Sequence, residues 1–349
     1  MTLALNEQQN WREAMLYERQ PDGAARCRLC AHFCEIKDGE QGFCRVRENR
    51  GGTLYALAAY QLSAQHVDSV EKKPLFHFYP GSRTYSIAAY GCNFRCGYCT
   101  NWMVSQANGA TPAANGATAQ PEEIVAAAGA ARCRSIAYTY IEPTIFFEFI
   151  NDIARLAHAA GLFNVFKTNG FMSAEMLDSC RPFLDAANVD LKAFRDLSYQ
   201  RFGGRLQPVL DNLKRMKASG VWLEVTTVLI PGVNDTSAEL KEMAEFIAAE
   251  LGVDTPWHLS RFFPAYRMTD ATPTSVETLR RARDIGLAQG LRYVYAGGIP
   301  DKGRQDTLCH KCGAVLIERK GFDLLTNRSE RGGCPHCAAP ISGIGISNA

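Results

Sequence analysis

Short segments of β-branched and aromatic residues alternate with longer segments in which apolar residues recur at helical spacing. This alternation predicts βα units on a parallel sheet, because parallel neighbours need a crossover that a helix supplies. We expect six such units. The predicted strands span residues 84–90, 135–140, 163–168, 187–191, 222–230 and 257–263, with a further strand at 292–295.

The predicted helices lie between these strands. One begins at Pro121 and carries Glu122 and Glu123 in its first turn, where a fixed φ and negative charge both favour a helix N-terminus. Six parallel units are too few for a closed eight-stranded barrel, so the α/β fold is either an open partial barrel or a doubly wound sheet. The other predicted helices span residues 144–160, 173–181, 208–219, 236–250 and 275–289.

Residues with reactive side chains come within or just after the ends of these strands. In both candidate folds ligands bind at the carboxyl ends of the parallel strands, so this edge is the expected site. Residues 107–120 contain a repeated Ala-Asn-Gly-Ala-Thr, lack hydrophobic periodicity and are expected to form a flexible loop. The strand-end residues are Cys92, Glu142, Lys167, Thr168, Asn169, Asp190, Lys192 and His258.

The composition narrows the class of protein. With 349 residues, 46% of them hydrophobic, the chain can build a sizeable core in two or three domains. Lys and Arg number 38 against 36 Asp and Glu, a net charge of +2 without a basic tail, so we expect no nucleic-acid partner. No apolar run is long enough for a membrane span and the first residues lack a signal-peptide pattern, so we expect a soluble, cytoplasmic protein without a membrane partner.

Eleven of the thirteen cysteines fall into three tight groups. In a reducing cytoplasm, clustered thiols indicate metal sites rather than disulfides. Four protein ligands close a structural metal site, whereas three leave a position open, so the middle group is the predicted active centre. Cys133 and Cys180 stand alone and are expected to be buried helix residues. The groups are Cys27, Cys30, Cys34 and Cys44; Cys92, Cys96 and Cys99; and Cys309, Cys312, Cys334 and Cys337.

The middle group has the spacing C-x3-C-x2-C, and a fourth Cys or His is missing from its neighbourhood in the sequence. Thiolates select zinc, copper(I) or iron–sulfur centres, and the spacing alone does not choose among them. Three thiolates suit a cuboidal iron–sulfur cluster with one exposed iron. A zinc site that borrows a distant ligand is the alternative.

This segment resembles the radical S-adenosylmethionine (SAM) superfamily, whose members carry C-x3-C-x2-C after the first strand of a six-unit partial barrel. The resemblance implies an open partial TIM barrel, (βα)6, in which Cys92, Cys96 and Cys99 bind a catalytic 4Fe-4S cluster. It also implies that the fourth iron binds SAM through its amino and carboxylate groups. One electron from the cluster then cleaves a carbon–sulfur bond of SAM to give a radical.

Two further motifs support the resemblance independently of the cysteines. The segment 138–144 ends in Glu-Pro-Thr where relatives keep Gly-Gly-Glu-Pro, which implies that Glu142 holds the amino group of SAM. Thr168, Asn169 and Gly170 are similar to the family's Thr-Asn-Gly turn, although such a tripeptide alone is usually only a turn.

The pair Asp190 and Lys192 looks like the Asp-x-Lys motif of glycyl-radical-enzyme activases. Two residues apart on a strand, both side chains point to one face, where the acid can bind the ammonium group of SAM and the lysine its carboxylate. By family analogy, Tyr98 packs on the adenine and His258 contacts the ribose or the carboxylate. The structural alternatives are a solvated ion pair for Asp190 and Lys192, ordinary aromatic packing for Tyr98 and a core position for His258.

Over nearly its full length the chain resembles one branch, the AmmeMemoRadiSam system radical SAM enzymes, related to pyruvate formate-lyase activating enzyme. Two positions depart from the pattern: Thr100 stands in place of a glutamine, and Lys167 in place of an acid before Thr-Asn-Gly. If that acid normally helps to bind SAM, Lys167 contacts the carboxylate instead or leaves the task to Glu142 and Asp190. The matching segments are 27–47, 71–82, 92–99, 138–144, 190–192, 230–235, 258–264 and 309–337.

The outer cysteine groups predict small metal-binding modules at residues 1–70 and 301–349, on either side of a barrel at 71–300. The C-terminal spacing C-x2-C-x21-C-x2-C closely approaches that of a zinc ribbon and predicts zinc, since small hairpins need such a staple to fold. The N-terminal spacing C-x2-C-x3-C-x9-C suits zinc or a second 4Fe-4S cluster, and both stay open.

The expected function is reductive cleavage of SAM to a 5′-deoxyadenosyl radical that abstracts hydrogen from an unspecified substrate, a protein glycine being one candidate. Transfer of a 3-amino-3-carboxypropyl group from SAM stays open as an alternative. A non-catalytic metal-binding scaffold or electron carrier is the alternative of another class. The cofactors implied are a 4Fe-4S cluster, SAM and zinc, and the partner implied is a flavodoxin or ferredoxin-type electron donor.

Overall fold

The computed structural model describes residues 11–57, 59–107, 117–298, 303 and 305–347. Its centre is an eight-stranded sheet in the order β16-β15-β14-β13-β12-β11-β9-β8. From β9 to β16 the strands are parallel and follow one another in chain order, whereas β8 pairs antiparallel with β9. The strands are β8 (Ala64–Ser69), β9 (Arg83–Ala88), β11 (Ser135–Tyr138), β12 (Phe163–Thr168), β13 (Ala186–Asp190), β14 (Trp222–Leu229), β15 (Trp257–Arg261) and β16 (Val294–Gly297).

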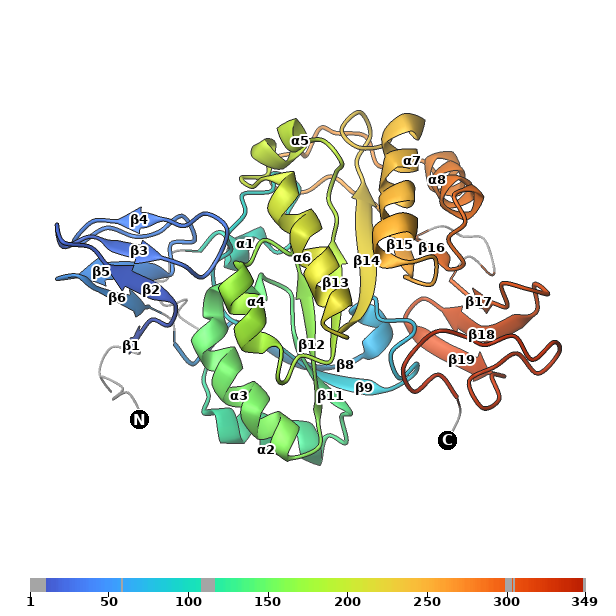
Figure 1. Cartoon of the computed structure of the whole chain (residues 1–349), viewed down its shortest axis with the longest axis horizontal. Helices are drawn as coiled ribbons and strands as arrows, with labels where there is room; N and C mark the ends of the chain where they lie inside the picture. The colour runs from blue at the N-terminus through green and yellow to red at the C-terminus, as the bar shows by residue number, and fades with distance from the viewer. Residues whose placement is uncertain (1–10, 58, 108–116, 299–302, 304, 348–349) are drawn as a thin grey trace.

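Helices connect the parallel strands. Right-handed crossovers between strands in chain order place every connecting helix on one face, so the sheet curls with its other face inward. Figure 1 shows α3, α4, α6, α7 and α8 following one another around the strands. Because β8 and β16 end the sheet, the barrel is open, and the predicted fold class is confirmed. The helices are α1 (Trp102–Ser105), α2 (Pro121–Ala130), α3 (Phe147–Ala159), α4 (Ala174–Cys180), α5 (Asp196–Arg201), α6 (Leu206–Ala218), α7 (Ser237–Phe246) and α8 (Val276–Ala288).

The predicted barrel elements agree with the structure and differ mainly at their ends. The predicted helix at 144–160 begins as a 3-10 turn, Pro143–Phe146, and the one at 236–250 ends in a π-helical turn, Ile247–Leu251. Cys180 is the last residue of α4 as expected, but Cys133 lies in the turn after α2 rather than in a helix. Both cysteines are buried.

The N-terminal residues form two small antiparallel sheets, β1-β6-β5 and β2-β3-β4. Their strands have two to four residues, too short for a period to appear, so the sequence did not predict them. The segment 117–118, at the end of the predicted loop, is strand β10 and pairs with β7, while residues 108–116 lie outside the described residues. The strands are β1 (Arg12–Glu13), β2 (Tyr17–Arg19), β3 (Ala25–Cys27), β4 (Glu35–Ile36), β5 (Arg47–Arg50), β6 (Thr53–Ala56), β7 (Gln61–Leu62) and β10 (Ala117–Thr118).

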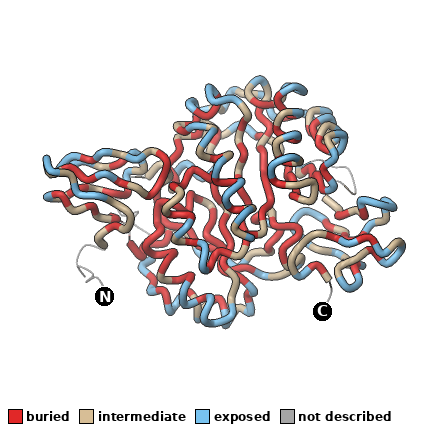
Figure 2. The backbone as a smooth tube through the Cα atoms, viewed as in Figure 1, coloured by how far each residue is buried: buried red, intermediate tan, exposed pale blue. Residues whose placement is uncertain are grey.

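The C-terminal residues form a three-stranded antiparallel sheet of β17 (Thr307–Leu308), β18 (Val315–Lys320) and β19 (Asp323–Asn327). Figure 1 shows this sheet and the N-terminal sheets on opposite sides of the barrel. Figure 2 shows that the central strands are largely buried, while exposed residues gather on the helices and on both small modules. None of the described helices combines the length and apolar composition that a bilayer crossing requires.

Candidate active site

A cavity of about 440 Å³ lies at the carboxyl ends of the barrel strands. The strands β9, β11, β12, β13, β14 and β15, with the segments that follow them, all contribute to its wall. It therefore lies where an open barrel is expected to bind ligands. Ten of the predicted site residues line it: Cys92, Cys96, Tyr98, Cys99, Glu142, Lys167, Thr168, Asn169, Asp190 and Lys192.

Three thiols converge on this cavity from the cluster loop, residues 91–99. Each thiol interacts electrostatically with the other two. The amide of Phe94 donates to Cys92 Sγ at 3.3 Å, and Cys99 Sγ lies 3.2 Å from Ser105 Oγ. Burial raises the pKa of Cys96 to about 11, although Lys192 opposes the shift, so metal binding must displace its proton. Three soft ligands facing a cavity fit a metal centre that keeps one position open.

The Glu142 carboxylate is held in place by four hydrogen bonds. Its Oε1 accepts from the amide and hydroxyl of Thr144, at 3.1 and 2.6 Å, and from the hydroxyl of Thr168 at 2.7 Å. Its Oε2 accepts from the amide of Asn169 at 2.7 Å. Burial raises the pKa of Glu142, and these donors oppose the shift. Since Oε2 accepts only one of these four bonds, a cation in the cavity can still bind to it.

Asp190 lies between two lysines. Both Lys167 and Lys192 form ion pairs with it, the latter at 3.0 Å. Burial alone would raise the pKa of Asp190, but the charges of the two lysines outweigh it and lower the pKa to about 2. Burial lowers the pKa of Lys167, whereas Asp190 raises it. With both lysines protonated the group has one net positive charge, and the acid expected to bind an ammonium group is already paired.

Tyr98 is buried in the cavity wall. Its ring packs edge-on against Phe202 and Phe262, with centroids 5.4 and 6.4 Å away. Lys192 Nζ lies 5.8 Å from its centroid. These contacts give the cavity an aromatic wall beside the three thiols.

His258 lies elsewhere, apart from the other predicted residues. It shares a strand face with Ser260, which lines the cavity, but it is one layer deeper toward the amino end of β15. Its Nε2 is 2.6 Å from Oε2 of Glu224. This oxygen also accepts from the amide of Phe76 at 3.0 Å, and Oε1 of Glu224 accepts from the amide of His77 at 2.8 Å. This network holds His258 in a buried position outside the wall of the site cavity.

Two asparagines support the site and were not predicted. Asn188 Oδ1 accepts from Lys167 and from Thr226, both at 2.7 Å. Asn93 Oδ1 accepts from Asn169 Nδ2 at 2.7 Å, which ties the cluster loop to the turn after β12. The sequence does contain a signal for Asn188, because it lies two residues before Asp190 and residues two apart on a strand share a face. Asn93 has no such signal, because its partner is distant in the sequence.

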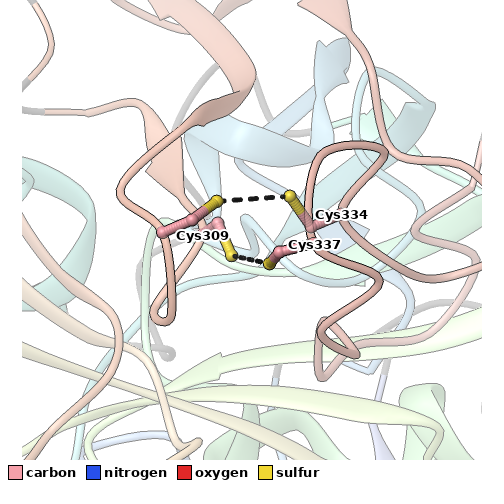
Figure 3. A group of neighbouring side chains, drawn as sticks. Cys309, Cys334 and Cys337 are labelled. Carbon is pink, nitrogen blue, oxygen red and sulfur yellow. Dashed lines mark hydrogen bonds between the residues drawn. The ribbon is translucent and has the colours of Figure 1, made fainter.

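The C-terminal cysteine tetrad, Cys309, Cys312, Cys334 and Cys337, is compact. Its four sulfur atoms all lie within 4.8 Å of one another, and two pairs are 3.6 Å apart. Zn–S bonds of about 2.3 Å in a tetrahedron place the sulfurs about 3.8 Å apart, close to this arrangement. Figure 3 shows the sulfurs facing one another between two loops. Burial raises the pKa of Cys309, but hydrogen bonds from nearby amides outweigh it and bring the pKa to about 7.

Comparison with known proteins relates this arrangement to a family. The model of the Radical SAM superfamily matches residues 86–247, which include the cluster loop, Glu142 and Asp190. An uncharacterized protein of Methanocaldococcus jannaschii is 44% identical over 312 residues, or 89% of this chain and 92% of that protein. Benzylsuccinate synthase activating enzyme of Thauera aromatica is 31% identical over 121 residues, 32% of this chain and 36% of that enzyme.

A solved structure supports the fold. SuiB of Streptococcus suis, bound to SAM, superposes with a TM-score of 0.50 at 12% identity, covering 66% of this chain and 53% of SuiB. The family implies SAM and an iron–sulfur cluster, and the three cavity cysteines fit that requirement. The chain is therefore an enzyme rather than a metal-binding scaffold or electron carrier. The family match, the open barrel and the three-cysteine loop together identify the chain as a member of the radical SAM superfamily.

Proposed function

We propose that the chain binds a 4Fe-4S cluster through Cys92, Cys96 and Cys99 and converts SAM to a 5′-deoxyadenosyl radical that takes hydrogen from a substrate. When bound and reduced, this cluster supplies the electron that cleaves the carbon–sulfur bond. Among the described residues that line the cavity, these three are the cysteines, which leaves one iron for SAM.

The separation of opposite charges in the cavity carries this proposal. Glu142 presents a carboxylate oxygen at the end of β11, whereas Lys167, Asp190 and Lys192 leave one net positive charge at the ends of β12 and β13. The amino acid end of SAM carries an ammonium and a carboxylate group on one carbon. We assign the ammonium group to Glu142 and the carboxylate to the two lysines, because charge-assisted hydrogen bonds favour both pairings.

The aromatic wall is suited to the other end of SAM. Tyr98, within the cluster loop, and Phe262 offer an apolar surface on which an adenine can pack. Thr168 and Asn169 hold Glu142 in position through their hydrogen bonds. In this proposal Thr168 and Asn169 act through Glu142.

The reaction needs an external electron. We propose a flavodoxin or ferredoxin-type donor and a cytoplasmic location, where thiols stay reduced for cluster assembly. We also propose zinc at the C-terminal cysteine tetrad, because its short sulfur–sulfur distances suit a single tetrahedral ion.

A glycine of a partner protein is the substrate class that we propose to test first. The partial similarity to benzylsuccinate synthase activating enzyme supports it. The binding site of this chain differs from that of activases at Lys167, because activases often carry an acid at this position.

The test is anaerobic incubation of the reconstituted, dithionite-reduced protein with SAM, followed by mass spectrometry of the nucleosides. We expect 5′-deoxyadenosine from the wild type and none from Cys99→Ala, while Cys133→Ala keeps the activity because Cys133 lies outside the cavity. Methylthioadenosine in place of 5′-deoxyadenosine would contradict the proposal and indicate aminocarboxypropyl transfer. Equal product from the wild type and Cys99→Ala would also contradict it.

A further inference from the structure

The N-terminal cysteine tetrad, Cys27, Cys30, Cys34 and Cys44, is brought together by the hairpin of β3 and β4 and by a tight turn. The amide of Cys27 donates to the carbonyl of Cys34 at 2.9 Å across the hairpin. Every pair of the four thiols interacts electrostatically, so all four converge on one place. Two of them, Cys27 and Cys30, are less than a tenth exposed.

The spacing of these thiols differs from that of the C-terminal tetrad. Among the described residues, the C-terminal tetrad is the only set of three or more cysteine, histidine or acidic ligands whose atoms all lie within 4.8 Å. No three N-terminal thiols therefore approach one another as closely, in the part of the chain that the structure describes. The three thiols of the cluster loop are likewise not all within 4.8 Å of one another.

This difference discriminates between two kinds of metal centre. Four thiolates on one zinc ion must lie about 3.8 Å apart, since all bonds meet at one atom. In a 4Fe-4S cluster each thiolate binds a different iron, so the sulfur atoms lie farther apart. The described residues thus contain one tetrad with the spacing of a zinc site and another whose thiols, like those of the cluster loop, fall outside the 4.8 Å limit.

The N-terminal tetrad is attached directly to the cluster loop. His32 lies between Cys30 and Cys34, and its Nε2 is 2.8 Å from the carbonyl oxygen of Asn93. Gly91 has a φ of +88°, and a Cβ there would lie 2.6 Å from Val46 and 3.1 Å from the carbonyl oxygen of Cys44. The turn that carries Cys44 therefore packs against the residue before Cys92.

The surroundings of the tetrad suit an anionic centre. The Arg95 guanidinium interacts electrostatically with both Cys44 and Cys92, and its NH1 donates to the Cys92 carbonyl at 2.8 Å. Arg47 is almost fully buried and interacts with Cys27 and Cys44. Positive charge around thiolates stabilises and tunes an iron–sulfur cluster.

We propose that the N-terminal cysteine tetrad binds a second 4Fe-4S cluster, which passes one electron at a time from the flavodoxin or ferredoxin-type donor to the cluster loop. The donor is oxidised by one electron, the second cluster is reduced and reoxidised, and the cluster at Cys92, Cys96 and Cys99 is reduced by one electron. The metal assignment stands without the proposed function, whereas the electron transfer rests on it. Four protein ligands leave the second cluster without an open iron, so it binds no SAM.

Iron, sulfide and zinc analysis of the anaerobically reconstituted full chain tests the assignment. We expect about eight iron, eight sulfide and one zinc per chain in the wild type, as two 4Fe-4S clusters and one ion require. The variant with Cys92, Cys96 and Cys99 all changed to alanine should keep half of the iron. Its reduced electron paramagnetic resonance spectrum should not change when SAM is added. Two zinc ions with about four iron in the wild type would overturn the proposal, as would a triple variant without iron.

A single variant tests the electron path. Cys34→Ala should lose half of the iron, keep dithionite-driven cleavage of SAM and lose at least about tenfold in flavodoxin-driven cleavage, while Cys133→Ala serves as the matched control. If Cys34→Ala keeps flavodoxin-driven cleavage at the wild-type rate, the path is wrong. If it loses all iron because it misfolds, the metal counts of the wild type and the triple variant still decide the assignment. Because these counts need no turnover, an inactive enzyme with two clusters would contradict the proposed function alone.

Discussion

Asp190 is the residue whose predicted role changes most in the structure. On β13 it faces the cavity as expected, but Lys167 from β12 and Lys192 from its own strand end both pair with it. Its pKa of about 2 keeps it ionised at any working pH. It therefore favours the charged form of two half-buried lysines, and these lysines are the groups suited to bind a carboxylate.

Asp190→Asn should make SAM binding depend on pH. Burial lowers the pKa of Lys167 and Asp190 raises it, so removing the acid lowers that pKa further. As the pH rises through the lower value, the lysine loses its charge and affinity falls by about tenfold, or about 1.4 kcal/mol. Calorimetric titration of the reconstituted protein with SAM between pH 6.5 and 9 measures this. The affinity of the wild type and of the exposed control Asp178→Asn for SAM should depend less on pH. Parallel curves of affinity against pH for all three proteins would contradict this role of Asp190.

Glu142→Gln should weaken SAM binding at every pH in that range. The amide keeps an oxygen for the hydroxyl of Thr168 but loses the negative charge that faces an ammonium group. A hydrogen bond to a charged group contributes about 1.5–3 kcal/mol, so Kd should rise by about tenfold or more. The same titration measures it, with exposed Glu122→Gln as the control. An unchanged Kd would remove Glu142 from the proposed contacts.

The turn after β12 shows how one element positions the site. Thr168, Asn169 and Gly170 connect Glu142, the cluster loop and α6, because Asn212 on α6 donates to the Gly170 carbonyl at 2.8 Å. Gly170 has a φ of +71°, and a Cβ there would lie 2.8 Å from Val189. Only glycine meets both conditions without strain, so the tripeptide is more than an isolated turn.

Gly170→Ala should destabilise the chain by about 1–3 kcal/mol, because it combines a left-handed backbone with a close contact. Gly129→Ala is the matched control, since Gly129 lies within α2 and has open space around its Cα. That change should be neutral or stabilise by about 0.5–1 kcal/mol. Thermal unfolding monitored by circular dichroism measures both. Equal melting temperatures for the two variants would contradict the assigned strain.

At the scale of the whole molecule, buried ion pairs fasten the N- and C-terminal modules to the barrel. Arg47 on β5 pairs with Glu148 on α3, and both side chains are about 2% exposed or less. Arg319 on β18 is fully buried and donates to the carbonyl of Phe76 at 2.8 Å. The attachment of both modules to the barrel therefore depends on buried charged groups, which water does not reach to solvate if their partner is removed.

Arg47→Met should cost about 3–5 kcal/mol, because it leaves the Glu148 carboxylate buried without its cation. The double variant Arg47→Met with Glu148→Gln should recover part of this loss. Glutamine keeps an acceptor for the amide of Met15, which donates to Glu148 at 2.7 Å. Thermal unfolding of the wild type and both variants measures the difference. A double variant less stable than Arg47→Met would show that the buried charge is not the cause.

Local sequence was sufficient for the order and type of the seven parallel strands, for most helices between them and for ten residues of the cavity, whereas β8, α1 and α5 were not predicted. The spacing of apolar residues distinguishes strands from helices. Parallel strands that follow one another in chain order, joined by right-handed crossovers, have their carboxyl ends at one edge of the sheet. The spacing of Cys92, Cys96 and Cys99 is likewise a local property, since one loop carries all three. The short N-terminal strands were not predicted, because two to four residues are too few to show an alternation of apolar and polar positions.

Distances between residues far apart in the chain depended on the packed fold. Pairing of β12 with β13 places Lys167 beside Asp190, and the layers inside the barrel bury His258 against Glu224 below the cavity. The short sulfur–sulfur distances that set the C-terminal tetrad apart from the other two cysteine groups also come from packing, because spacing along the chain does not fix them. Such contacts depend on the register of the sheet and on the close packing of side chains. A local sequence pattern determines neither of these.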